Sequence, residues 1–360
     1  MPTTYAIPDG RKQMNVVLYT GTNSTSQNVN GFGFQPDLVW VKNRDNVENH
    51  HLMDSVRGNN KFILSNSTAV ERTGSMNSGN NALAFISDGF SITSNGTGDE
   101  LNFGTRTYSA WAWKANGTAA SNTSGSITSS VSANTTAGFS VVTYTGTGAS
   151  NATVGHGLGV TPKLVILKAR TTNSTSSEWW VSHAGLTSGY NIYLNRTDPQ
   201  FGPISSGTTS GGIGTLSSTI FTLANGTSTN NNTNQTSCNY VAYCWSEVPG
   251  FSAFGNYTGN DSTDGTFVYT GFRPKFVMIK NITTSATSWI LLDSARNSYN
   301  VENSILLPND TAAEDSSSNR MDFLSNGFKL RLAGGWGNSS TATYIYMAFA
   351  ENPFKYANAR

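Results

Sequence analysis

Short runs of apolar residues separated by polar turns recur along the chain, and they predict strands rather than helices. Three runs are closely alike, at residues 38–42, 164–168 and 276–280. Each follows a Gly-x-x-Pro turn, is apolar at nearly every position and ends in Lys. Pro suits the start of a strand, where a missing N–H costs no ladder hydrogen bond. A nearly continuous apolar run indicates burial on both faces, so we expect each run to be a central strand.

Other strands accompany this one in the same order each time. An earlier strand ends in Tyr-Thr-Gly, and a closing strand alternates aromatic residues over 108–113, 240–245 and 344–349. Aromatic alternation with a period of two is typical of a half-buried strand that packs rings into a core. At least five strands in about 110 residues fit a β-sandwich. The repeat therefore predicts an all-β chain of three tandem antiparallel β-sandwich modules, jelly-roll-like in form.

A third strand also aligns between the copies and leads into a distinctive turn. Its equivalent positions are His50, Trp179 and Trp289 at the start, and Asp54, His183 and Asp293 at the end. In the first and third copies an Arg follows the Asp after three positions, and Gly or Asn comes next. This spacing is typical of a turn held by a charge pair. The residues predicted for this structural turn are Asp54, Arg57, Asp293 and Arg296.

The repeats also define the expected boundaries. We expect an N-terminal arm over 1–13, modules over 14–117, 138–249 and 250–360, and a Ser/Thr/Gly-rich linker over 118–137. The linker holds one strongly apolar residue, Ile127. The polar, low-complexity stretch 225–237 is expected to be mobile or ordered by a partner.

The composition narrows the function classes. Charged residues make up 12% of the 360 residues, and the net charge is +1, so no basic stripe is available for nucleic acid. No stretch approaches the roughly 20 apolar residues of a membrane helix, and the first residues have no apolar signal-peptide core. We therefore expect no nucleic-acid binding, membrane insertion or Sec secretion. Cys238 and Cys244 would lie about 20 Å apart along one strand, which favours reduced, buried thiols over a metal or redox role.

Candidate catalytic and metal-binding residues do not recur between the copies. The histidines are His50, His51, His156 and His183, and the candidate carboxylates are Asp99, Glu100 and Glu178. Neighbouring strand residues point to opposite faces, so His50 and His51 are unsuited to share one ion. No Ser/His/Asp, Cys/His or paired-carboxylate arrangement repeats. Residues 260–265 resemble the start of a calcium loop, but Gly271 occupies the position of the closing Glu. We expect no catalytic residue, metal or cofactor.

Sugar binding is the site chemistry that a β-sandwich most readily accommodates, and it needs exposed aromatic rings. The candidates for a glycan platform are Trp336, Trp179, Trp180 and Trp289. Trp336 stands out because it lies within a Gly-rich loop. The alternatives for this ring are a cover over the end of the sandwich and a contact between subunits.

The motifs together resemble a domain common in virion proteins of marine and other bacteriophages. They are Tyr-Thr-Gly, Gly-Phe-x-Pro-x-x-Val-x-x-Lys, Asp-Ser-x-Arg-Gly, Asp-Gly-Phe and a closing Trp-x-Trp. That domain occurs in tail-fibre-like and other structural proteins, often beside concanavalin-like (laminin-G type) sandwich domains. The first copy carries the whole pattern, the second lacks the Asp-Ser-x-Arg turn, and the third ends in Tyr-x-Met-x-Phe.

The resemblance implies a non-enzymatic structural protein of the virion, made in the host cytoplasm. Only about a dozen residues precede the first module, which favours a compact capsid or tail component: a decoration protein, a spike or a fibre knob. The expected partners are other virion proteins and further copies of the chain, with a trimer favoured. The alternative is an adhesin that binds a host surface glycan. A sandwich enzyme that degrades polysaccharide is the third and weakest alternative.

Overall fold

The computed structural model describes residues 7, 9–74, 82–93, 100–172, 177–204, 211–224 and 233–352. These residues form 26 strands, with one 3-10 turn, η1 (Gly10–Lys12), and one helical turn, α1 (Gly335–Asn338). Every pairing between the strands is antiparallel. No helix in these ranges is long and apolar enough to cross a membrane. The prediction of an all-β antiparallel sandwich fold is confirmed.

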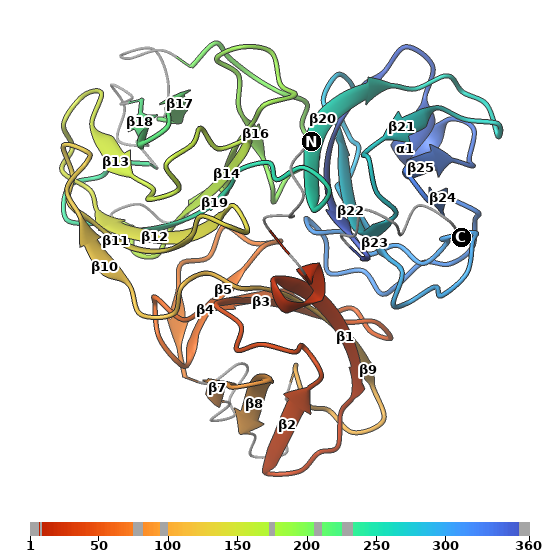
Figure 1. Ribbon diagram of the computed structural model, residues 1–360, viewed down its shortest axis with the longest axis horizontal. Helices are drawn as coiled ribbons and strands as arrows, with labels where there is room; N and C mark the ends of the chain where they lie inside the picture. The colour runs from red at the N-terminus through yellow and green to blue at the C-terminus, as the bar shows by residue number, and fades with distance from the viewer. Residues whose placement is uncertain are drawn as a thin grey trace.

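The sheets fall into three groups, which we call the first, second and third units (Figure 1). The first unit has a six-stranded sheet, β1-β9-β3-β4-β5-β6, and a three-stranded sheet, β2-β8-β7. Its strands are β1 (Met14–Thr20), β2 (Ser26–Asn30), β3 (Leu38–Asn43), β4 (His50–Asp54), β5 (Lys61–Leu64), β6 (Arg72–Thr73), β7 (Ala82–Ile86), β8 (Gly89–Thr93) and β9 (Thr107–Trp113).

The second unit has a seven-stranded sheet, β10-β11-β12-β19-β14-β15-β16, and a three-stranded sheet, β13-β18-β17. Its strands are β10 (Ala120–Asn122), β11 (Ser129–Asn134), β12 (Phe139–Thr145), β13 (Thr153–Gly155), β14 (Leu164–Ala169), β15 (Trp180–His183), β16 (Ile192–Tyr193), β17 (Ile213–Leu216), β18 (Ile220–Leu223) and β19 (Asn239–Trp245).

The third unit has a four-stranded sheet, β20-β26-β22-β23, and a three-stranded sheet, β21-β25-β24. Its strands are β20 (Ser252–Thr258), β21 (Phe267–Tyr269), β22 (Pro274–Asn281), β23 (Ile290–Asp293), β24 (Met321–Leu324), β25 (Gly327–Leu330) and β26 (Thr343–Ala350).

The apolar runs are central strands, as their burial pattern predicts. β3 lies between β9 and β4, β14 between β19 and β15, and β22 between β26 and β23. The third-strand alignment is also correct. The equivalent pairs are Leu38 with Asp54, Leu164 with His183, and Phe276 with Asp293. The two strands therefore pair in the same register in all three units. Asp54, His183 and Asp293 lie at the contacts between the units, described below.

The segment 118–137 differs from the predicted linker. It supplies β10 and β11, which extend the sheet of the second unit beside β12. Ile127 and Val131 are buried in the core of that unit. Ser and Thr tolerate the extended backbone well, so a polar composition did not exclude strands here. The predicted arm is described only at residue 7 and from residue 9 onwards, and most of the polar stretch 225–237 lies outside the described residues.

The three units lie around a common centre (Figure 1), and one cluster of buried apolar side chains includes residues of all three. Each also has a core of its own between its two sheets. At the centre, the last aromatic residues of the closing strands meet: the ring of Trp113 lies 5.9 Å from those of Trp245 and Phe349, centre to centre. All three rings are buried. The units thus share packing, and the predicted division into separate modules stays a prediction.

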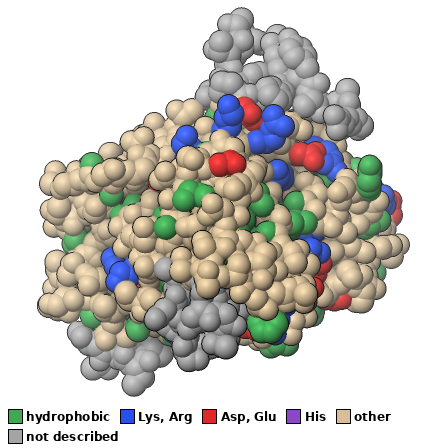
Figure 2. All heavy atoms as spheres, turned by 90° about the horizontal axis from the view of Figure 1, so that it is seen from below, with side chains coloured by type: hydrophobic (Ala, Val, Ile, Leu, Met, Phe, Trp, Pro, Cys, Tyr) green, Lys and Arg blue, Asp and Glu red, His purple; other side chains and the backbone are tan. Residues whose placement is uncertain are grey.

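The molecular surface carries few charged side chains, as expected from the 12% of charged residues in the sequence. Figure 2 shows a face on which uncharged polar groups and backbone dominate, with charged side chains in small groups of both signs. The charge pairs that matter most for the fold are instead buried between the units.

Candidate functional site

Trp336, the loop tryptophan among the glycan candidates, lies in the helical turn α1 at one end of the third unit. Gly334 precedes this turn with φ of 63°, in the left-handed region that favours glycine. Asn338 ends the turn, is fully buried and donates to the Ser262 carbonyl at 2.8 Å. The Tyr257 hydroxyl donates to the carbonyl of the residue after Trp336, also at 2.8 Å. The loop is therefore fixed in place.

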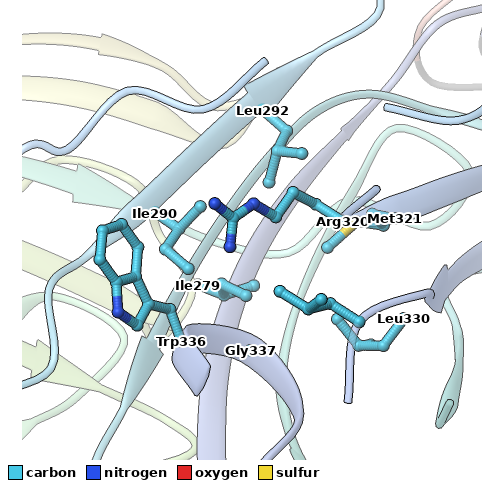
Figure 3. A pocket seen from close by; sticks show the side chains of 9 residues that line it. Ile279, Ile290, Leu292, Arg320, Met321, Leu330, Trp336 and Gly337 are labelled. Atoms are coloured by element: carbon cyan, nitrogen blue, oxygen red, sulfur yellow. The ribbon is translucent and has the colours of Figure 1, made fainter. Parts of the chain in front are cut away.

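A small apolar pocket lies beside this ring (Figure 3). Aliphatic side chains from the third unit line it, among them Ile279, Ile290 and Leu330. Its cavity volume is about 20 Å³, which is room for about one water molecule. A sugar ring does not fit unless a wall moves.

Arg320 forms one wall and covers Trp336. Its guanidinium carbon lies 5.5 Å from the centre of the indole ring, a cation–π contact. Nη2 donates to Asp315 at 2.7 Å, whereas the buried Nε has no partner among the described residues. The half-buried indole also packs on the core of the third unit. A pyranose needs an open ring face, so Trp336 becomes a platform only when Arg320 swings away.

The other three tryptophans are buried, with exposed fractions of 0% for Trp179, 1% for Trp180 and 2% for Trp289. Buried rings cannot present a face to a ligand, so these residues form no surface platform. Trp180 packs edge-on against Tyr193 and Phe201 inside the second unit.

Trp179 and Trp289 instead connect neighbouring units. The indole N–H of Trp179 donates to the Leu64 carbonyl of the first unit at 2.8 Å. The indole N–H of Trp289 donates to the Tyr193 carbonyl of the second unit at 2.9 Å. Each thus joins its own unit to the preceding one. The shared position of the two tryptophans was visible in the sequence, but their partners were not.

The Asp-Arg turn of the first unit also forms a joint, by which we mean the contact between two units. The backbone N–H of Arg57 donates to Asp54 at 2.8 Å, and its guanidinium pairs with Asp54 and, at 3.1 Å, with Glu71. Two residues of the second unit complete the cluster. Arg170 donates to both oxygens of Glu71 at 2.9 and 3.1 Å, and the Tyr243 hydroxyl donates to Asp54 at 2.8 Å. We call these five residues the first latch.

The third unit repeats this arrangement against the first unit. Arg296 pairs with Asp293 at 2.7 Å and with Glu314 at 3.0 Å. Arg44 of the first unit donates to both oxygens of Glu314 at 2.9 and 2.7 Å. The indole N–H of Trp111 donates to Asp293 at 2.9 Å. These five residues are the second latch.

Among the described residues, the joint between the second and third units has no such latch. His183 stands in place of the Asp and bonds through Nε2 to the Tyr346 carbonyl at 3.0 Å. Ile282 occupies the position that Arg44 has in the first unit and Arg170 in the second, two residues after the buried Lys of the central strand. A Cβ on Gly185 would lie 2.8 Å from the Gly255 carbonyl oxygen, so the two backbones approach closely here. The second unit thus lacks the Asp-Ser-x-Arg turn, and the third unit lacks the Arg that corresponds to Arg44 and Arg170. Both differences lie at the joint between these two units.

The charge states follow from these contacts. Burial alone would raise the pKa of Glu71, but hydrogen bonds from Arg170 and the charge of Arg57 outweigh it and hold the pKa below its usual value. The same balance, with its own arginines, lowers the pKa of Glu314. Burial lowers the pKa of His183 to about 4, so this ring is neutral at neutral pH. In the part of the chain that the structure describes, two joints thus contain ion pairs, and the His183 contact at the third is between neutral groups.

A buried lysine ends the central strand of every unit, at Lys42, Lys168 and Lys280. Burial lowers their pKa values to about 8, 7 and 7 respectively. Such an amine is a candidate nucleophile in principle. Here, however, each side chain donates to backbone carbonyls, such as that of Ser177 for Lys168 and that of Asn281 for Lys280. These lysines therefore provide hydrogen bonds to buried backbone carbonyls.

The other candidate residues lie apart from one another. His51 Nε2 lies 2.7 Å from Glu100, whereas His50 accepts from the indole N–H of Trp40 at 3.0 Å. His156 bonds to the Ser217 carbonyl. Glu178 accepts from Asn195, and within residues 260–265 Asp264 pairs with Lys329. Cys238 and Cys244 are buried and not in a disulfide. In the described ranges, no three His, Cys, Asp or Glu side chains could hold a metal ion. Asp99 lies outside them.

The geometry defines an all-β sandwich protein whose three groups of sheets are joined by the indole hydrogen bonds of Trp179 and Trp289 and by the two latches. This chain belongs to a family described as Domain of unknown function (DUF7483), whose model matches residues 9–353. That single match runs through all three units. A search of curated proteins found no match.

Proposed function

We propose that this protein is a non-enzymatic structural component of a bacteriophage virion. It would lie on the capsid or tail surface as a decoration protein, a spike or the knob of a fibre. The observation that carries the proposal is the locking of three sandwich units into one body by the two latches and the shared core. Such an arrangement suits a part that must keep its shape in an assembly.

The motifs that resemble phage virion domains support this proposal, because they are the residues that build the joints. The Asp-Ser-x-Arg turn supplies the centre of each latch, and the closing aromatic strands supply Tyr243, Trp111 and the central rings. The charge-poor surface also suits contact with neighbouring coat proteins without strong nonspecific attraction (Figure 2).

Three similar units around one centre also bear on the expected partners. One chain presents three related surfaces, as a trimer would, and so matches a threefold position on a symmetric particle. Other virion proteins and further copies of the chain remain the proposed partners. The virion is the proposed location after synthesis in the host cytoplasm.

The test is to purify particles from the phage or prophage that encodes this chain. Quantitative mass spectrometry should find the protein at a fixed copy number per particle, and cryo-electron microscopy should locate it on the surface. Recovery of the chain from the lysate but not from the particles would reject the proposal.

Binding of a host glycan is the second candidate, and the arrangement of Trp336 and Arg320 at the end of the third unit favours it. If adhesion is the main role, Trp336→Ala should weaken binding to host cells while particles still incorporate the protein. A glycan array and cell-binding assay without signal, on particles that contain the protein, would remove this candidate.

A further inference from the structure

The second unit contains a polar cavity that lies apart from the latches and from Trp336. Its volume is about 380 Å³, and it lies among β15, β17 and β18. This is within the range of about 300–1,000 Å³ that small-molecule sites occupy. The pocket beside Trp336, at about 20 Å³, is far smaller.

The lining of this cavity is neutral and rich in hydrogen-bonding groups. It includes the side chains of Ser182, Ser188, Thr215, Thr222 and Asn151. Within the described part of the chain, none of these side chains is hydrogen-bonded to another residue. Two aliphatic side chains, Ile204 and Leu216, add apolar surface, and the described residues of the lining include no Lys, Arg, Asp or Glu.

The wall formed by β17 is held in place from behind. Asn191 is fully buried, accepts from the backbone N–H of Ile213 at 2.8 Å and donates to its carbonyl at 3.0 Å. The register between β17 and β18 then shifts between Ile213 and Leu216. Such an irregularity redirects side chains, and it often accompanies a site. Here it falls at Gly214 and Thr215, on the cavity wall.

We propose that this cavity binds a neutral saccharide of one or two rings. Hydroxyl and amide side chains can pair with sugar hydroxyls, and the two aliphatic side chains can cover the C–H face of a ring. A sialic acid, uronic acid or phosphorylated sugar would bring a charge that none of the described lining side chains compensates, and an unpaired charge in such a site is costly. The described lining residues include no aromatic side chain, which predicts weak binding of a single ring.

The proposal goes beyond the structural role and does not depend on Trp336. A virion protein without this activity would still join particles, and a binding site would still exist if the chain had another location. Incorporation of the Thr222→Val variant into particles, measured beside its sugar binding, separates the two failures.

The experiment is saturation-transfer difference NMR on the full chain. The probes are the methyl glycosides of glucose, galactose, mannose and N-acetylglucosamine, with sialyllactose and glucuronic acid as charged comparisons. We expect transfer to at least one neutral glycoside and none to the charged probes.

Thr222→Val removes one lining hydroxyl with little change of shape, and it should weaken that binding about fivefold, the effect of one hydrogen bond. Gly214→Ala adds one methyl group to the cavity wall formed by β17. A Cβ there would lie 3.5 Å from the Thr222 side chain, an ordinary contact, so the variant should fold and bind less. Thr143→Val is the control, because Thr143 lies on another groove of the same unit.

Three results would overturn the proposal. They are no transfer to any neutral glycoside, equal loss of binding in Thr222→Val and Thr143→Val, and preference for the charged probes.

Discussion

Tyr243→Phe is the sharpest probe of the joints because it removes a single oxygen from the first latch. That hydroxyl comes from the second unit, donates to Asp54 at 2.8 Å and accepts from Arg57 at 3.2 Å, both of the first unit. Burial raises the pKa of Tyr243 well above its usual value, so the hydroxyl stays protonated and donates. Phe keeps the ring and removes only these two hydrogen bonds, while the Arg170–Glu71 pair of the same joint remains.

The size of the effect follows from the charges involved. The bond to Asp54, the shorter of the two, is a hydrogen bond to a charged group, which contributes about 1.5–3 kcal/mol, and the side chains of Asp54 and Arg57 are both fully buried. At about 2.1 cal/mol/K per residue, the 360 residues give an unfolding entropy of about 0.76 kcal/mol/K. Tyr243→Phe should therefore lower Tm by about 2–4 °C.

Differential scanning calorimetry measures this shift, with urea unfolding as a second observable. Tyr193→Phe is the matched control: Tyr193 is half-buried, and its hydroxyl has no hydrogen bond to another described residue. It should leave Tm nearly unchanged. Equal shifts in the two variants, or no shift in Tyr243→Phe, would show that the latch hydroxyl does not stabilise the joint.

Three further predictions concern the other buried groups. Burial, followed by the charge of Asp293, raises the pKa of Glu302 to about 8 from 4.5, so the folded state binds more protons than the unfolded state; stability should fall as pH rises from about 4.5 to 8, and Glu302→Gln should flatten this slope in pH-dependent unfolding. Trp289→Phe should cost more than Trp180→Phe by about 0.5–1.5 kcal/mol in urea unfolding, because only the first loses an inter-unit hydrogen bond while the Trp180 indole N–H has no partner among the described residues. His183→Asp restores the residue of the other copies without an Arg, and should destabilise by about 3–5 kcal/mol because it buries an unpaired charge; an unchanged Tm would contradict this account of the third joint.

The strand framework was predictable because it depends on local pattern. Apolar runs after Gly-x-x-Pro mark buried central strands, and the alignment of Asp54, His183 and Asp293 gave the correct register. The Asp-to-Arg spacing likewise predicted a charge-paired turn, and the structure has both pairs. Each of these features is decided within a few residues of the chain.

The joints were not predictable in the same way. Glu71 and Arg170 lie 99 residues apart in sequence, and Arg44 and Glu314 lie 270 apart, so no local pattern connects them. A tryptophan in a predicted strand looks the same in the sequence whether its ring forms a surface binding site or packs between two units, so the roles of Trp179 and Trp289 were not predictable. A comparison of the copies offered one clue to the difference between the joints. The second copy lacks the Asp-Ser-x-Arg turn, and the third has Ile282 at the position of Arg44 and Arg170.

The most direct test of the central claim, that the three units form one cooperative body, is the calorimetric unfolding of the unmodified chain. The account predicts a single transition with an enthalpy near 250 kcal/mol, from about 0.7 kcal/mol for each of the 360 residues, and a van't Hoff enthalpy close to the calorimetric one. Two or three resolved transitions, each with the enthalpy of one unit, would contradict it.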